Sequence, residues 1–275
     1  MSEPFGFPNS PTTPPNMPSA MPPPPPPGGF LPPPGYVAYG GNQYAQPAAN
    51  IGTLTKWLVA LMSIGLVAQL LSLGVQFSLR NKAQEVIDDV ISSSRFNDSL
   101  GMYIAISLLA GVAALAQVVV LIIWTFRLGK NAEGALRRKE QMKFGRPGIT
   151  IVINLLGNCT LGILNFLMWR ELWQASDPES PAGDPSWRQR PVAAIVNVYF
   201  ALTIAGTAVG LALGVSGAFG GIKVGTDSTQ LADQLSGRFG ILALSGLFTI
   251  AASVAFILMI RQLAARHMRA TGEIA

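Results

Sequence analysis

Three asparagines in an apolar stretch are the residues whose type and spacing come closest to a site for chemistry. Asn154, Asn158 and Asn165 interrupt residues 148–169, and amides in hydrocarbon need protein partners or water. On a continuous helix, positions i, i+4 and i+11 share one stripe at 100° per residue. Such a stripe predicts a water-filled path for a small solute. The alternative is that the amides bond to neighbouring helices and hold a bundle in register.

Other reactive side chains are few. The chain has one histidine, His267, and one cysteine, Cys159, too few for a zinc site built on these residues. His267 lies in a basic tail, where we expect it to be solvated, with no serine and carboxylate beside it. Asp177, Glu179 and Asp184 could bind a hard cation, but a solvated loop is the simpler interpretation. We expect no catalytic residue, no metal and no cofactor, and therefore a protein that is not an enzyme.

Long uncharged runs must position these residues. Charged residues make up 12% of the chain, against about 25% in a typical globular domain. Each run has at least 22 residues and contains no Asp, Glu, Lys, Arg or His, so each is long enough to cross a bilayer as a helix. The runs cover about 57–79, 101–126, 148–169, 192–216 and 239–260. The sequence predicts an all-α integral membrane protein, a bundle of four to five transmembrane helices within residues 51–270, and disfavours coupled transport because no ionisable group is buried in a run.

The third run either crosses the membrane or re-enters on the same side. If it re-enters, fourteen of the nineteen Lys and Arg residues face the cytoplasm; if it crosses, the division is ten inside and nine outside. The positive-inside rule therefore favours a re-entrant segment. A run of 22 residues also satisfies the length for crossing, so both topologies stay open.

A basic loop follows the second run. We expect it to extend the preceding helix over residues 132–141 and to lie on anionic lipid headgroups rather than on nucleic acid. Trp124 and Arg127 would mark the membrane interface just before it. This orientation predicts a protein of the cell membrane with a cytoplasmic N-terminus. The lipid-facing cations are Lys130, Arg137, Arg138, Lys139, Lys143 and Arg146.

Two further segments suggest contacts with partners. Gly206, Gly210 and Gly214 repeat every four residues, so another helix can approach closely, either within the bundle or in a homo-oligomer. Residues 1–50 hold sixteen of the twenty-one prolines and one charge, which predicts a disordered tail with polyproline II stretches. The tail either docks on a soluble partner or acts as a spacer. Residues 271–275 form a short C-terminal tail.

One family resemblance runs through the middle of the chain. The spacing W-x-x-R-x-x-x-N, a Pro-Gly turn and the ending R-E-L-W-x-A-S-D-P resemble actinobacterial multi-pass membrane proteins known as domain of unknown function 4328. The chain differs from that family at Ile149, where a Trp is usual, and in lacking the prolines near Asn158 and Asn165. The resemblance implies membrane location and bacterial origin but no activity. The matching residues are Trp124, Arg127, Asn131, Pro147, Trp169, Arg170, Glu171, Trp173, Asp177 and Pro178.

Two functions fit these observations. The first is a non-enzymatic scaffold or accessory subunit of the bacterial cell membrane, with the proline-rich tail recruiting a partner. The second is an uncoupled channel or facilitator for a small solute, lined by the asparagine stripe.

Overall fold

The computed structural model describes residues 47–215 and 228–273, except for the side chains of Asn158 and of residues 212–238. Nearly all of the predicted proline-rich tail and the last residues of the C-terminal tail lie outside the described residues, as do the surroundings of Gly214.

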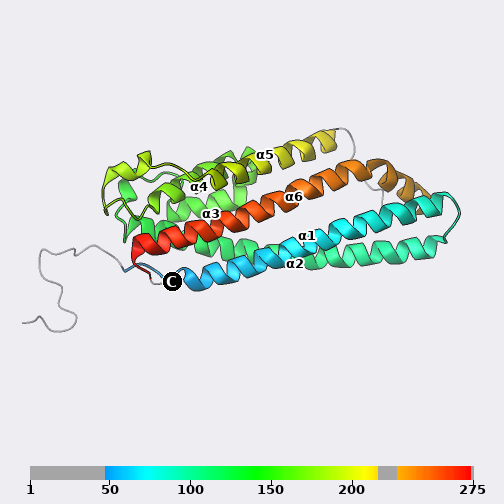
Figure 1. Ribbon diagram of the computed structural model, residues 1–275, viewed down its shortest axis with the longest axis horizontal. Coiled ribbons are helices and arrows are strands. Elements are labelled where there is room, and N and C mark those ends of the chain that lie inside the picture. The colour runs from blue at the N-terminus through cyan, green and yellow to red at the C-terminus, as the bar shows by residue number, and fades with distance from the viewer. Residues whose placement is uncertain (1–46, 216–227, 274–275) are drawn as a thin grey trace, which may run out of the picture. The chain divides into compact units, whose positions relative to one another are not determined.

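Every regular element in the described part of the chain is helical. The long helices are α1 (Gly52–Ile87), α2 (Ser93–Glu133), α5 (Ala194–Val215) and α6 (Ser228–Thr271) (Figure 1). All four are long and apolar enough to cross a membrane. The predicted all-α fold with membrane-spanning helices is therefore confirmed. Shorter elements are α3 (Pro147–Leu156), α4 (Ile163–Ala175) and the 3-10 turns η1 (Lys139–Gln141), η2 (Gly157–Thr160) and η3 (Pro185–Gln189).

The long helices pack in the order α5, α6, α1, α2 (Figure 1). The glutamines of α1 supply polar contacts on both sides of that helix. Gln69 Oε1 accepts from Ser253 Oγ of α6 at 3.1 Å, and Gln76 Nε2 donates to Tyr103 Oη of α2 at 3.3 Å. Each amide thus has a partner on a neighbouring helix, which lowers the cost of placing it in an apolar bundle.

The two chain ends of the bundle meet. The Glu273 carboxylate, just after α6, accepts from the backbone N–H groups of Ile51 and Gly52 at 2.9–3.2 Å. These N–H groups lie at the start of α1, where a helix has no internal acceptors for them. The start of α1 and the end of α6 therefore lie at the same end of the bundle, which we call the basic end for the cations described below.

Residues 148–169 do not form one helix. Leu161 and Gly162 have φ values of 54° and 78°, and this left-handed pair separates α3 from α4. The Glu171 carboxylate near the end of α4 accepts from Lys143 N, Phe144 N and Gly145 N, just before α3 begins. The chain therefore enters and leaves the α3–α4 hairpin at the same end. Helices of 10 and 13 residues are about 15 and 20 Å long, shorter than a hydrocarbon core of about 30 Å.

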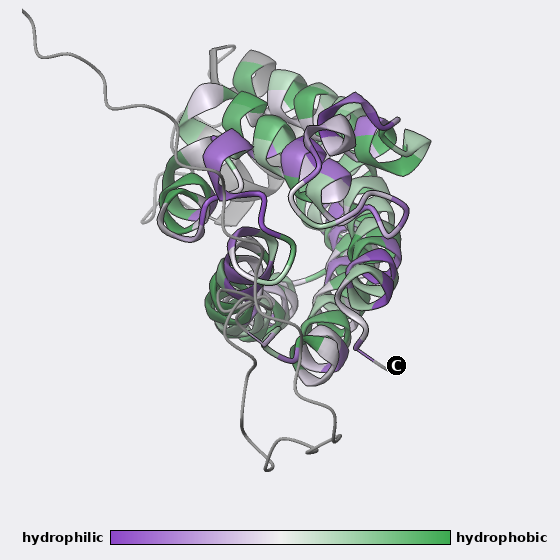
Figure 2. Ribbon diagram, turned by 90° about the vertical axis from the view of Figure 1, so that its left-hand side faces the viewer, coloured by the Kyte–Doolittle hydropathy of each residue, from purple (hydrophilic) through white to green (hydrophobic). Residues whose placement is uncertain are grey.

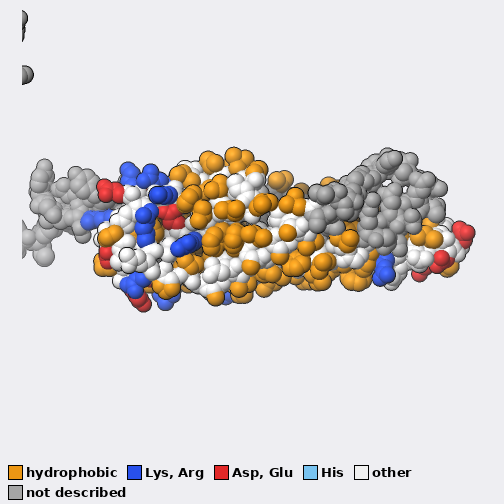
Figure 3. All heavy atoms as spheres, turned by 90° about the horizontal axis from the view of Figure 1, so that it is seen from above, with side chains coloured by type: hydrophobic (Ala, Val, Ile, Leu, Met, Phe, Trp, Pro, Cys, Tyr) orange, Lys and Arg blue, Asp and Glu red, His pale blue; other side chains and the backbone are white. Residues whose placement is uncertain are grey.

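Apolar side chains face outward along the helices. Leu108, Leu109 and Leu115 of α2 are 68–71% exposed, and Figure 3 shows hydrophobic side chains covering the middle of the described surface, with charged groups gathered toward its ends. Such a surface suits lipid as the surrounding medium.

The small residues of α5 have unequal surroundings. A Cβ atom on Gly206 would lie 3.6 Å from Phe248 Cβ of α6, whereas one on Gly210 would meet no described atom within 4 Å. Gly206 therefore lies at the α5–α6 contact inside the bundle.

Candidate functional site

A buried polar network occupies the basic end of the bundle, where hydrophilic segments join the helices (Figure 2). His267 of α6 is fully buried. Its Nδ1 lies 2.8 Å from Ser176 Oγ, and its Nε2 lies 3.2 Å from Asn131 Nδ2. The side chain of Asn131 also donates to the Ala49 carbonyl at 2.9 Å and accepts from the Ala49 N–H at 2.8 Å.

These contacts define the protonation of His267. The Oδ1 atom of Asn131 accepts from the Ala49 N–H and its Nδ2 donates to the Ala49 carbonyl, so the orientation of the amide is fixed. The Nδ2 group must then also be the donor to Nε2 of His267. Nε2 is then the acceptor nitrogen, and Nδ1 carries the proton that it donates to Ser176 Oγ. The imidazole is neutral and links α2, α4 and α6.

The prediction that His267 is solvated and has no serine beside it is wrong. The helix α6 continues past its apolar part to Thr271, and Ile260, Leu263, Ala264 and His267 are all buried. Their i, i+3, i+4, i+7 spacing is the pattern of one helix face, so the buried position was readable from the sequence. Ser176 is itself only 1% exposed, so the pair holds helices together instead of facing solvent.

Asp177 is the centre of a second set of contacts. Its carboxylate, 3% exposed, lies 2.5 Å from Arg266 Nη2 and 3.1 Å from Arg190 Nε, and accepts from Ser180 Oγ at 2.6 Å. Arg190 also lies 3.4 Å from Glu179, whose side chain is 76% exposed. The buried carboxylate therefore connects the end of α4 to α6 and to the segment before α5.

Arg138 is buried, contrary to the prediction that it faces lipid. Its guanidinium donates to the carbonyls of Ser180 at 3.1 Å and Asp177 at 3.4 Å, and lies 5.5 Å from the Trp187 ring centre. Burial lowers the pKa of Arg138, and the negative charges of Asp177 and Asp184 oppose that shift. The helix α2 ends at Glu133, so the predicted helix over 132–141 is wrong beyond Glu133, apart from the turn η1. The other five predicted cations are exposed: Lys130, Arg137, Lys139, Lys143 and Arg146.

The loop that Arg138 holds has a turn of its own. Hydrogen bonds from the Ser186 N–H at 2.9 Å and the Ser186 hydroxyl at 2.7 Å hold the pKa of Asp184 below its ordinary value. The carboxylate thereby begins η3, the turn that carries Trp187. Within the described residues, no group of three or more His, Cys, Asp or Glu side chains is placed to hold a metal ion.

The tryptophans of the motif are buried in the core of the protein. Trp124 is fully buried and its indole N–H donates to Thr55 Oγ1 at 2.8 Å. Its ring centre lies 6.4 Å from that of Trp169, and Arg266 lies 5.5 Å from the ring centre of buried Trp173. Trp124, which is expected from the sequence to mark the membrane interface, therefore packs against protein and does not face lipid.

The remaining motif residues lie at the ends of helices. Arg127 Nη1 donates to the Asn50 carbonyl at 3.0 Å, and Pro147 is the first residue of α3. Arg170 and Pro178 are exposed. The motif thus brings the segment before α1, the end of α2 and the α3–α4 hairpin together at one end.

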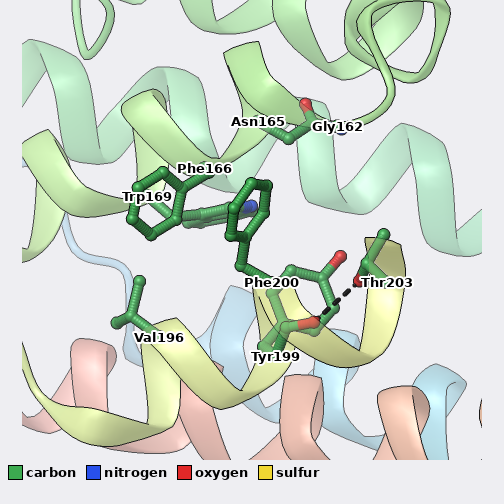
Figure 4. A pocket seen from close by; sticks show the side chains of 8 residues that line it. All are labelled: Gly162, Asn165, Phe166, Trp169, Val196, Tyr199, Phe200 and Thr203. Atoms are coloured by element: carbon green, nitrogen blue, oxygen red, sulfur yellow. Dashed lines mark hydrogen bonds between the residues drawn. The ribbon is translucent and has the colours of Figure 1, made fainter. Parts of the chain in front are cut away.

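The asparagines lie on different helices because of the break at 157–162. Asn154 of α3 donates to Thr125 Oγ1 of α2 and to the Thr150 carbonyl, each at 2.8 Å. Asn165 of α4 borders a small cleft between α4 and α5, beside the stacked rings of Phe166 and Phe200 (Figure 4). The volume of this cleft is about 10 Å³, which is about the room that one water molecule requires.

Comparison with known families identifies a match over most of the chain. Residues 87–265 match the family described as Domain of unknown function (DUF4328), a range that covers well over half of the chain and contains the whole motif from Trp124 to Pro178. Neither the curated proteins nor the solved structures give a match.

Proposed function

The chain belongs to the family described as Domain of unknown function (DUF4328), and we propose that it is a non-enzymatic scaffold or accessory subunit of the bacterial cell membrane. Its four long apolar helices already make it a membrane protein. The finer assignment depends on what its polar residues do.

One observation carries the proposal: the polar side chains of the motif hold the chain's own segments together. Asn131 pairs with the Ala49 backbone, Glu171 with three N–H groups before α3, and Asp177 with Arg266 and Arg190. A general acid or base must reach its substrate, whereas these groups are buried and matched to partners inside the protein. The motif therefore builds a rigid end on the bundle, and the surfaces around it remain for partners.

The positions of the cations support one membrane orientation. The basic end exposes cations of the loops and of α4 and α6, and the opposite turn between α1 and α2 carries both acidic and basic groups. The α3–α4 hairpin enters and leaves at the basic end. By the positive-inside rule, the basic end and the N-terminus lie in the cytoplasm, and the hairpin is re-entrant. The exposed cations of this end are Lys56, Lys130, Arg137, Lys139, Lys143, Arg146, Arg170, Arg188, Arg261 and Arg269.

Affinity purification tests the scaffold role. Full-length protein would be compared with a chain that lacks residues 1–46 and with a full-length chain in which Pro22–Pro27 are replaced by alternating Gly and Ser. The proposal expects at least one soluble protein to co-purify with the full-length chain and to be lost from both variants. Loss only with the truncated chain would assign the tail to spacing, and identical sets from all three proteins would remove its role in recruitment.

The second candidate is an uncoupled path for a small solute, favoured by the position of Asn165 at the cleft between α4 and α5. Here Asn154 and Asn165 are replaced together by Leu, and solute flux is measured in liposomes. The channel function expects flux in the wild type and its loss in the variant. Wild-type liposomes that pass no solute would end this candidate.

A further inference from the structure

A second cleft at the basic end lies between the loop before α3, the helix α4 and the turn η3. Its volume is about 210 Å³, and the residues lining it include Lys143, Arg170 and Arg188 together with Leu167 and Trp187. Each of the three cations comes from a different segment, and all three are exposed. Figure 3 shows Lys and Arg side chains gathered at this end, next to the hydrophobic surface.

The cations are partly held in place. The Arg188 guanidinium donates to the Gln141 carbonyl and lies 5.6 Å from the Trp187 ring centre, so one face of it is packed before any ligand arrives. Arginine binds phosphate oxygens through paired N–H groups, and lysine adds a point charge. The cleft therefore matches a phosphate group.

One carboxylate also lines the cleft. Glu171 is buried, and it accepts from the N–H groups of Lys143, Phe144 and Gly145. Its oxygens are directed to these backbone donors, and the three cations outnumber it, so the cleft keeps a net positive charge.

An apolar strip leads from this cleft toward the tip of the hairpin. Ile163, Leu167, Arg170 and Gln174 follow each other at intervals of four, three and four residues, which places them on one face of α4. Ile163, at the start of α4, is 49% exposed. From Ile163 to Arg170 the helix rises about 10 Å, within the depth of about 15 Å of one hydrocarbon leaflet.

From these features we propose that the cleft binds one anionic phospholipid, with the phosphate held by Lys143, Arg170 and Arg188 and one acyl chain along Leu167 and Ile163. The inference rests on the membrane placement given under the proposed function. It goes further in assigning a single lipid site to residues from both sides of the hairpin and from η3.

Native mass spectrometry of the full-length protein in detergent tests this site. Phosphatidylglycerol and phosphatidylcholine are titrated into wild type, into K143Q/R170Q, and into the matched control K139Q/R261Q, which removes two exposed cations outside the cleft. Because K143Q/R170Q removes two charges that would bind the phosphate, we expect it to bind the first phosphatidylglycerol about tenfold more weakly than wild type, or weaker still. The affinity of the control is expected to stay within about twofold of wild type. The charge-preserving variant K143R/R170K retains binding, and thermal unfolding shows that all variants are folded.

Three results would overturn the site. Equal losses in the cleft variant and the control would mean that only total charge matters. Equal affinity for the two lipids would remove the preference for an anion. Inorganic phosphate that binds as tightly as phosphatidylglycerol would assign the cleft to a soluble ligand. Each of these can occur while the co-purification results still support the scaffold, so the two proposals fail separately.

Discussion

Asp177 shows how single residues hold the basic end. A carboxylate that is 3% exposed and lies against two arginines has lost its water, and the arginines replace that solvation. Removing one member of such a buried group leaves the other charges uncompensated, which costs more than the group contributes as a whole. The same reasoning applies to Asn131, whose amide is the hydrogen-bond partner of both backbone groups of Ala49.

The substitution Asp177→Asn is expected to lower the free energy of unfolding by about 3–5 kcal/mol. Glu179→Gln is the matched control, because Glu179 pairs with the same Arg190 but is 76% exposed, and a surface pair contributes about 0–1 kcal/mol. Unfolding of both variants in detergent, followed by circular dichroism, gives the comparison. Similar small losses in both would show that Asp177 is not the centre of the basic end.

Asn131→Leu is expected to lower the free energy of unfolding by about 2–4 kcal/mol. The buried acceptor nitrogen of His267 loses its partner, at about 1–3 kcal/mol, whereas water can partly replace the hydrogen bonds of the part-buried N–H and carbonyl of Ala49. Asn197→Leu is the control, since Asn197 is an exposed amide on α5, and a change within about 0.5 kcal/mol is expected there. Limited proteolysis adds a local readout, with faster cleavage near Ala49 in the first variant only. A normal cleavage rate there would argue against the clamp.

The backbones of α2 and of the segment before α3 come very close to each other at the basic end. The helix α2 packs on the segment before α3 through Gly129, where an added Cβ atom would lie 2.5 Å from the Gly145 carbonyl oxygen and 3.1 Å from Pro147 N. Both neighbours are backbone atoms, so neither can move aside as a side chain would. The hairpin is therefore docked on α2 at a position where only glycine fits.

Gly129→Ala is expected to cost about 2 kcal/mol or more, in the upper part of the range for overpacking, and to loosen the hairpin from α2. Gly111→Ala in the same helix is the control: a Cβ atom there meets no atom of the described residues within 4 Å, and alanine stabilises a helix interior by up to about 1 kcal/mol relative to glycine. Opposite signs of the two changes in thermal unfolding are the expected result. Equal changes would show that the α2–hairpin contact is loose.

The sequence predicts the long helices well because each is an uncharged run with one physical cause, the cost of charge in hydrocarbon. It does not show that Trp124 and Arg138 are buried, because Trp124 packs against α1 and α4 and Arg138 is covered by the loop after α4. Local patterns held part of this information. Ile260, Leu263, Ala264 and His267 continue a helix face beyond the apolar run, and Gly129 lies inside the motif, but only the arrangement of segments shows what each of them meets.

In the described bundle as a whole, the positions of the exposed cations and the path of the α3–α4 hairpin support the same membrane orientation. The hairpin returns to the end where it began, so the exposed cations of the loops before α3 and after α4 lie at one end with those of α6. A crossing segment would have separated these groups by the thickness of the membrane. The agreement makes the sidedness of the loops the property that best tests the arrangement.

Cysteine labelling in intact cells is the measurement. In a Cys159→Ser background, Glu179→Cys, Arg269→Cys and Asp89→Cys place single thiols after α4, near the end of α6 and in the turn between α1 and α2; all three positions are exposed. Because the positive-inside rule puts the basic end in the cytoplasm, a membrane-impermeant maleimide should label only Asp89→Cys in intact cells and all three after permeabilisation. Glu179 is chosen for the thiol after α4 because its neighbour Ser180 is buried and would not react. If Glu179→Cys and Asp89→Cys both react in intact cells, residues 148–169 cross the membrane, and both the re-entrant hairpin and the lipid site on its cytoplasmic side are wrong.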